Sequence, residues 1–127
     1  LRLAYLELQQ PTTEARTESA VHCLRAAAEQ GHPEGQNGYA WVLATSRFAR
    51  LRDGATAVVQ AQKATAARRT ASRLDTLAAA FAETGGFAQA IATQREAIAA
   101  IDANANARRK DFDSHLASYN KGEAWRE

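Results

Sequence analysis

Alanine recurs along this chain in pairs seven residues apart, and the pairs themselves recur at a nearly constant interval. Successive pairs begin 37 and then 33 residues apart. Seven residues are about two helical turns, so each pair places two small side chains on one face of a helix. A neighbouring helix can lie close against such a face. The pairs are Ala20/Ala27, Ala57/Ala64 and Ala90/Ala97.

A bulky residue followed by alanine stands upstream at the same period, at Leu3-Ala4, Tyr39-Ala40 and Leu77-Ala78. The two sets of markers together predict a repeat of two helices. One such pair cannot bury its apolar face alone, so about three pairs must stack to form a core. We therefore expect one all-α domain over residues 1–127. Its helix pairs should cover about 1–30, 34–68 and 72–101, with a capping helix over about 104–120.

Local signals place the helices within these pairs. Gly31-His32-Pro33 ends one helix and starts the next, because glycine suits the left-handed C-terminal position and proline the first turn. Ser72-Arg73-Leu74-Asp75 is typical of a capping box that opens a helix, which Gly85-Gly86 ends. Trp125 is expected to fold back over the edge. The other expected helices cover 1–8, 14–30, 34–45, 54–68, 87–101 and 104–119.

Composition agrees with a helical chain and excludes several classes of protein. Alanine makes up 31 of the 127 residues, with two prolines and no methionine. No apolar run approaches the roughly 18 residues of a membrane span, and no signal segment opens the chain. The single Cys23 excludes an internal disulfide and a multi-cysteine metal site. Because Leu1 begins in mid-helix, we expect a mature form or a fragment, of undetermined compartment.

Charge is unevenly distributed along the sequence. The net charge of +2 conceals a segment, residues 47–73, in which seven basic residues accompany one acidic residue. The segments on either side each carry a net charge of −2. A basic segment of this kind attracts acidic partners or other anions.

Residues 74–102 resemble a tetratricopeptide repeat. That motif places large, Leu, small and large residues on its first helix, filled here by Leu74, Leu77, Ala78 and Phe81. Ala90 and Ala97 fill the small positions of its second helix, while Gln94 and Asp102 depart from the pattern. A second copy is similar through Tyr39, Ala40, Leu43, Ala57, Ala61 and Ala64.

Residues 27–34 are similar to the Sel1-like variant of this repeat, whose second helix ends in an Ala-Ala-Glu-Gln-Gly-His run. The resemblance implies a right-handed α-solenoid and, for its function, a protein-binding scaffold. It also implies which side chains are exposed on the concave surface. They are Glu34, Asn37, Trp41 and Thr45 from one pair, and Ser72, Asp75, Ala79, Ala82 and Glu83 from the next.

The expected function is non-catalytic binding of a peptide or protein. Trp41 either anchors the partner as a hot spot or packs in the core, and both alternatives stay open. Asn37 is the second expected anchor, although Asp75 and Ala79 do not fit a carboxylate clamp. The expected partner is acidic, because three arginines at the edge of the groove would steer it. They are Arg47, Arg50 and Arg52.

Three alternatives accompany this expectation. Residues 47–73 suit nucleic acid or another polyanion, but only Phe48 is available there for base stacking. The chain can also be a regulatory module of a larger enzyme. A third option is contact with flanking repeats or with a second copy of the chain.

Candidate catalytic and metal-binding residues are few. His22 and Cys23 are adjacent on a helix and point about 100° apart, so they form no dyad. Asp111 and His115 stand at i and i+4 and offer two metal ligands, whereas Asp113 points elsewhere. We expect an exposed, helix-stabilising charge pair instead. The sequence therefore predicts no enzyme, no metal and no cofactor.

Overall fold

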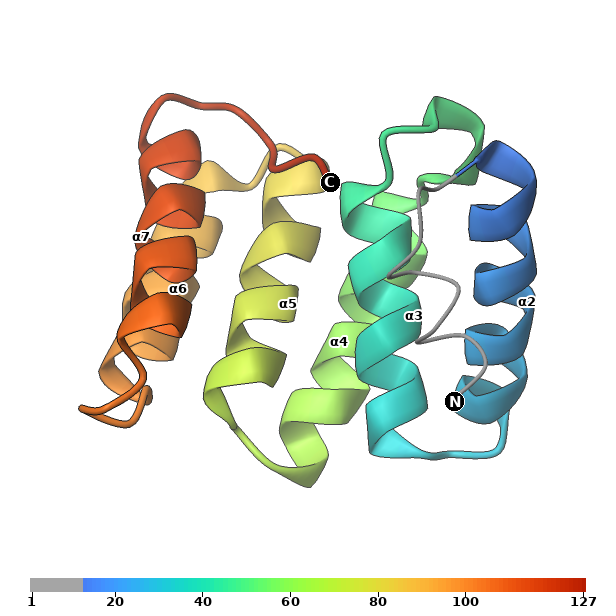
Figure 1. Ribbon diagram of the computed structural model, residues 1–127, viewed down its shortest axis with the longest axis horizontal. Helices are drawn as coiled ribbons and strands as arrows, with labels where there is room; N and C mark the ends of the chain where they lie inside the picture. Colours follow the sequence, from blue (N-terminus) through green and yellow to red (C-terminus); the bar gives the residue numbers. More distant parts are fainter. Residues whose placement is uncertain (1–12) are drawn as a thin grey trace.

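The computed structural model describes residues 13–127, and that part of the chain is entirely helical. It contains six α-helices, one short 3-10 helix and no strand. The expected helix over 1–8 and the Leu3-Ala4 marker lie outside the described residues. The helices, labelled as in Figure 1, are α2 (Glu14–Glu29), α3 (Pro33–Thr45), η1 (Ala49–Leu51), α4 (Gly54–Ala67), α5 (Ala71–Glu83), α6 (Phe87–Ala99) and α7 (Asn106–Asn120).

Consecutive helices run in opposite directions and pack against one another (Figure 1). Helices α3 and α5 lie side by side, with α4 behind them, and α6 lies behind α7. Helix α5 contacts α3, α4, α6 and α7, so it is the central helix of the described part. The expectation of an all-helical chain whose neighbouring helices pack together is confirmed.

The helix ends follow from local hydrogen bonds. Thr13 Oγ1 accepts from the Arg16 N–H at 3.1 Å and starts α2. Gly31 has a φ of +81°, which lets the His32 N–H donate back to Ala27 O and end the helix. Pro33 then opens α3, as the sequence predicts. The described helices begin and end within two residues of their expected bounds.

The expected capping box at Ser72 is wrong. Thr70 is the N-cap of α5, since its Oγ1 accepts from the Arg73 N–H at 3.2 Å. Ser72 therefore lies inside the first turn of the helix. Asp75 lies one turn further on and is buried, so its carboxylate is directed at other helices rather than at the N-terminus of its own.

The periodic alanines form the contacts between helices. Ala27 is half-buried and lies against Gly35 of α3, where α2 and α3 approach closely. In the core, leucines such as Leu74 and Leu77 fill the space around the alanines. The markers without any exposed surface are Ala20, Ala40, Ala57, Ala64, Ala78, Ala90 and Ala97.

A larger side chain at one of these alanines should destabilise the fold. Ala97 on α6 is fully buried beside Leu74 and Phe112. We expect Ala97→Leu to lower the free energy of unfolding by about 1–3 kcal/mol, because added methylenes cannot fit without shifting a helix. Ala92→Leu, at an exposed position of the same helix, is the control and should change it by less than about 0.5 kcal/mol. Urea unfolding measures both, and equal effects would contradict this view of the contact.

Gly35 should resist substitution although it lies within a helix. A Cβ built there would lie 2.6 Å from Ala27 Cβ and 2.9 Å from the Ala27 carbonyl carbon. Gly35→Ala should therefore destabilise the protein, against the gain of about 1 kcal/mol expected from helix propensity. Gly38→Ala on the same helix meets only the flexible end of Leu24, so it should be better tolerated. Thermal unfolding of the two variants compares them directly.

Candidate functional site

Three polar side chains from three helices meet inside the protein. Asp75 of α5 accepts hydrogen bonds on Oδ1 from Gln94 Nε2 of α6 and from His115 Nδ1 of α7, each at 2.8 Å. Gln94 Nε2 also lies 3.1 Å from Phe112 O. All three side chains are at least nine-tenths buried. This polar cluster (Asp75, Gln94 and His115) therefore sets how α5, α6 and α7 are placed relative to one another.

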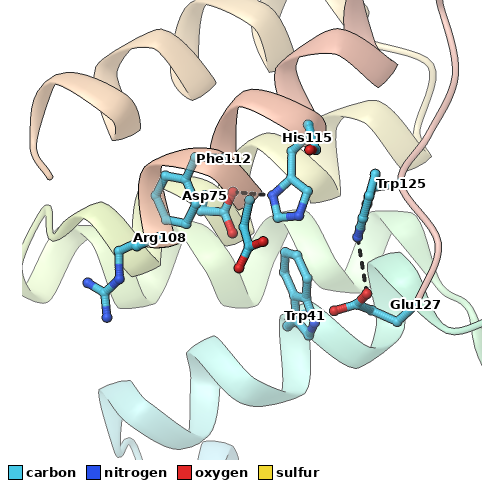
Figure 2. A pocket seen from close by; sticks show the side chains of 9 residues that line it. Trp41, Asp75, Arg108, Phe112, His115, Trp125 and Glu127 are labelled. Carbon is cyan, nitrogen blue, oxygen red and sulfur yellow. Dashed lines mark hydrogen bonds and ion pairs between the residues drawn. The ribbon is translucent and has the colours of Figure 1, made fainter. Parts of the chain in front are cut away.

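The cluster also determines how His115 is presented. A carboxylate oxygen only accepts hydrogen bonds, so the proton of the neutral imidazole lies on Nδ1. Nε2 of that neutral form carries a lone pair, and within residues 13–127 the hydrogen bond of the ring is at Nδ1. In Figure 2 this nitrogen lies on the side of the ring away from Asp75.

An open cavity of about 550 Å³ adjoins His115, between α3, α5, α7 and the C-terminal segment, residues 121–127. Trp41 and Trp125 line it and lie beside His115 (Figure 2). Their ring centroids lie 5.6 and 4.4 Å from that of His115. The remaining lining residues are Asp75, Arg108, Asp111, Phe112, Ser114 and Glu127.

The cavity is acidic. Asp111 is exposed and forms no ion pair within residues 13–127, and Glu127 Oε2 accepts from the Trp125 indole N–H at 3.2 Å. Burial raises the pKa of Tyr119, and the negative charges of Asp75 and Glu127 raise it further. Both carboxylates therefore act on this region of the protein.

Arg108 contributes a positive charge at the edge of the cavity rather than at its centre. Figure 2 shows its guanidinium directed away from His115 and the two tryptophans. The centre is thus formed by aromatic rings, carboxylates and the free nitrogen of His115.

The C-terminal segment lies across the ends of α3 and α5 (Figure 1). The Glu127 N–H donates to Thr45 O at 2.9 Å, and Arg126 Nη1 lies 3.3 Å from Ala44 O. Arg126 also pairs with Glu83 at 2.6 Å. Trp125 packs against the core around Tyr119, so the expectation that it folds back is confirmed.

Several expected groove residues are buried instead of exposed. Thr45 is 1% exposed at the end of α3, where its hydroxyl donates to Trp41 O at 2.7 Å and its carbonyl accepts from the Glu127 N–H at 2.9 Å. Asp75 is held in the polar cluster. Ala79 belongs to the core cluster that Trp41 packs against, and Ala82 to the cluster that Trp125 packs against. The expected exposure of these four residues is wrong, because the two tryptophans and the polar cluster cover this part of α5 and the C-terminal segment contacts the end of α3.

The other expected residues remain accessible at least in part. Glu34 is exposed at the start of α3. Asn37 is half-buried, with Nδ2 3.4 Å from Ser72 Oγ. Trp41 is half-buried: it packs against the core and also lines the cavity, so it combines both alternatives. Glu83 is half-buried between Arg52 and Arg126.

The arginines of the basic segment are largely paired within the protein. Arg50 pairs with Glu14 and Glu18 of α2 at 3.1 and 2.8 Å, which lowers the pKa of Glu18. Arg52 pairs with Glu83 at 3.3 Å. Arg47 lies over the Phe48 ring, 4.9 Å from its centroid. The segment is therefore less positive at its surface than its sequence suggests.

The expectation that Asp111 and His115 form an exposed charge pair is wrong. His115 is 6% exposed and bonds to Asp75, because the same face of α7 packs toward α5. Asp111 remains exposed. Among the described residues, no group of three or more His, Cys, Asp or Glu side chains is arranged to hold a metal ion.

Sequence reasoning missed Gln94, which it treated only as a departure from a repeat motif. The available signal was its position, four residues after Ala90 and three before Ala97, on the face of α6 that the alanines bury. A polar side chain on such a face requires a buried partner. Asp75 provides that partner.

Comparison with protein-family models, with curated proteins and with solved structures found no match. None of the helices in residues 13–127 is long and apolar enough to span a membrane.

Removing the carboxylate at the centre of the polar cluster should be costly. Asp75→Ala leaves one N–H of the Gln94 amide and the His115 Nδ1–H buried without an acceptor, since Phe112 O accepts from only one of the two Gln94 N–H groups, and each such group costs about 1–3 kcal/mol. We expect the free energy of unfolding to fall by about 2–4 kcal/mol. Asp113→Ala, at an exposed position of α7, should change it by less than about 0.5 kcal/mol. Urea unfolding that ranked the two variants equally would rule out a structural role for the cluster.

Proposed function

We propose that this chain is a non-catalytic scaffold that binds a peptide or protein on the face formed by α3, α5 and α7. In this proposal its helix pairs are tetratricopeptide or Sel1-like repeats in a right-handed solenoid. About three pairs would be present, and α7 would cap them. Support comes from the opposite directions of consecutive helices and from the fully buried alanines at the expected period.

The open cavity beside His115 is the observation on which the proposal depends. Its volume of about 550 Å³ is within the range of ligand pockets, and two tryptophans line it. Tryptophan is enriched among residues that dominate binding energy at interfaces, where it fills a pocket and excludes water. Asn37 lies one helical turn before Trp41 on α3, so the two proposed anchors share a face of the helix.

A non-catalytic role fits the surroundings of His115. Its Nε2 has no hydroxyl or thiol partner within residues 13–127. Ser114, the one hydroxyl residue lining the cavity, donates to Lys110 O at 3.1 Å and so bonds to its own helix. These contacts support binding rather than nucleophilic catalysis at this cavity.

The basic segment supports the polyanion alternative less well. Its ion pairs to α2, α5 and α6 neutralise Arg50, Arg52 and Arg69, the last of which forms two contacts of 2.8 and 2.9 Å with Glu96. Steering of an acidic partner by Arg47, Arg50 and Arg52 would have to compete with these internal contacts.

Trp41→Ala should abolish most of the partner affinity. Peptides are first selected from a displayed random library on the wild-type chain, and their dissociation constants are then measured by fluorescence anisotropy. Loss of a hot-spot tryptophan should weaken binding at least about tenfold. Tyr39→Ala removes an aromatic ring from the same helix outside the cavity and should weaken binding far less.

Two results would contradict the proposal. One is a failure to select any peptide while the wild-type chain is folded by circular dichroism. The other is tight binding of a single-stranded oligonucleotide that falls steeply with salt and ignores Trp41→Ala, which would favour the polyanion alternative.

A further inference from the structure

We propose that the cavity binds the cationic side chain of an arginine or lysine from the partner. This inference rests on the proposed function, because a bound peptide or protein would deliver the side chain. It specifies that the partner contacts the cavity through a basic side chain. The sequence alone had led us to expect an acidic partner.

The aromatic rings provide the first argument. Trp41 and Trp125 both line the cavity and lie beside His115, with ring planes tilted by 44° and 53° to that of His115 (Figure 2). The face of an indole ring attracts a cation, and tryptophan does so most strongly among the aromatic side chains. A cationic group bound in the cavity would have two indoles in its lining.

The charges around the rings provide the second argument. Asp75, Asp111 and Glu127 line the cavity, against one positively charged residue, Arg108. The Arg108 guanidinium is directed away from the centre (Figure 2). Asp111 has no ion-pair partner in the described chain, so its charge is available to a ligand. The cavity thus complements a positive group.

His115 provides the third argument, because one of its nitrogens is poised to accept a hydrogen bond. The residue is 6% exposed, and its Nδ1 is already bonded to Asp75. When the ring is neutral, its Nδ1 proton is directed at Asp75 and Nε2 is an acceptor, to which no side chain of residues 13–127 donates. A guanidinium or ammonium group supplies only donors, which suits an acceptor at this position.

The protein itself shows that a neighbouring surface binds a guanidinium. Arg126, on the extended C-terminal segment, pairs with Glu83 at 2.6 Å and approaches Ala44 O at the end of α3. Carbonyl groups at a helix C-terminus carry partial negative charge and favour cations. An extended segment bearing a basic residue is therefore already accommodated beside the cavity.

Titration with N-acetyl-arginine amide tests the inference on the full chain. Trp41 and Trp125 are the only tryptophans in the sequence, and both line the cavity. Their two indole N–H signals in a two-dimensional NMR spectrum therefore report on binding there. We expect saturable shifts of both signals, and a similar response to Nα-acetyl-lysine amide, which keeps its side-chain ammonium group. N-acetyl-citrulline amide has nearly the same shape without the charge and should bind at least about tenfold more weakly.

Two matched variants test whether the carboxylate of Asp111 contributes to binding of the arginine amide. Asp111→Asn should weaken binding of the arginine amide about threefold to tenfold, since it removes an unpaired carboxylate at the cavity. Asp113→Asn removes an exposed carboxylate from the same helix outside the cavity and should have little effect. Both positions are exposed, so neither change should disturb folding.

Three outcomes would overturn the inference. They are equal binding of the citrulline and arginine amides, equal effects of the two variants, and preferential binding of acetate or inorganic phosphate. If peptides are selected that depend on Trp41 but the arginine amide does not bind, the scaffold proposal stands and the inference fails. If the arginine amide binds as expected but no peptide is selected, the chemistry of the cavity is supported and the scaffold proposal fails.

Discussion

Contacts between alanine side chains hold the helices of this protein close together, and the rest of the structure depends on that closeness. Alanine loses no side-chain rotamer entropy on burial and lets helix axes approach at the short end of the usual 8–10 Å range. Each contact buries little apolar area, so stability requires many of them in register. Helix α5 shows the consequence. It has neighbours on several sides, and its alanines let α3 and α6 approach while Leu74 and Leu77 fill the remaining space.

The polar cluster fixes the relative positions of helices that alanine contacts alone would leave free to shift. A smooth face of small side chains allows one helix to slide along another, whereas hydrogen bonds to one carboxylate oxygen fix particular positions. Asp75 joins α5 to α6 and α7 in this way. The same bonds hold the His115 ring beside the cavity with Nε2 on the side away from Asp75. The buried cluster and the proposed binding site are thus two aspects of one arrangement.

Features determined by nearby residues were predictable from the sequence, and features determined by distant residues were not. Gly31 and Pro33 mark a helix boundary through their own backbone preferences, and the structure has that boundary. Ser72 and Asp75 had the spacing of a cap, but Thr70 competes for the same N–H groups and Asp75 bonds to residues 19 and 40 positions away. Thr45 O also accepts from the Glu127 N–H, a contact with the far end of the chain that no local pattern reports.

The same distinction explains why net charge along the chain was a poor guide to the partner. The segment 47–73 contains seven basic side chains, and their number alone suggests an acidic partner. In space, Arg50, Arg52 and Arg69 contact carboxylates of other helices. Ion pairing of this kind cancels charge at a distance, and it is the groups left unpaired that attract a ligand. Around the cavity, Asp111 is such a group, which is why a basic partner fits the folded protein better than an acidic one.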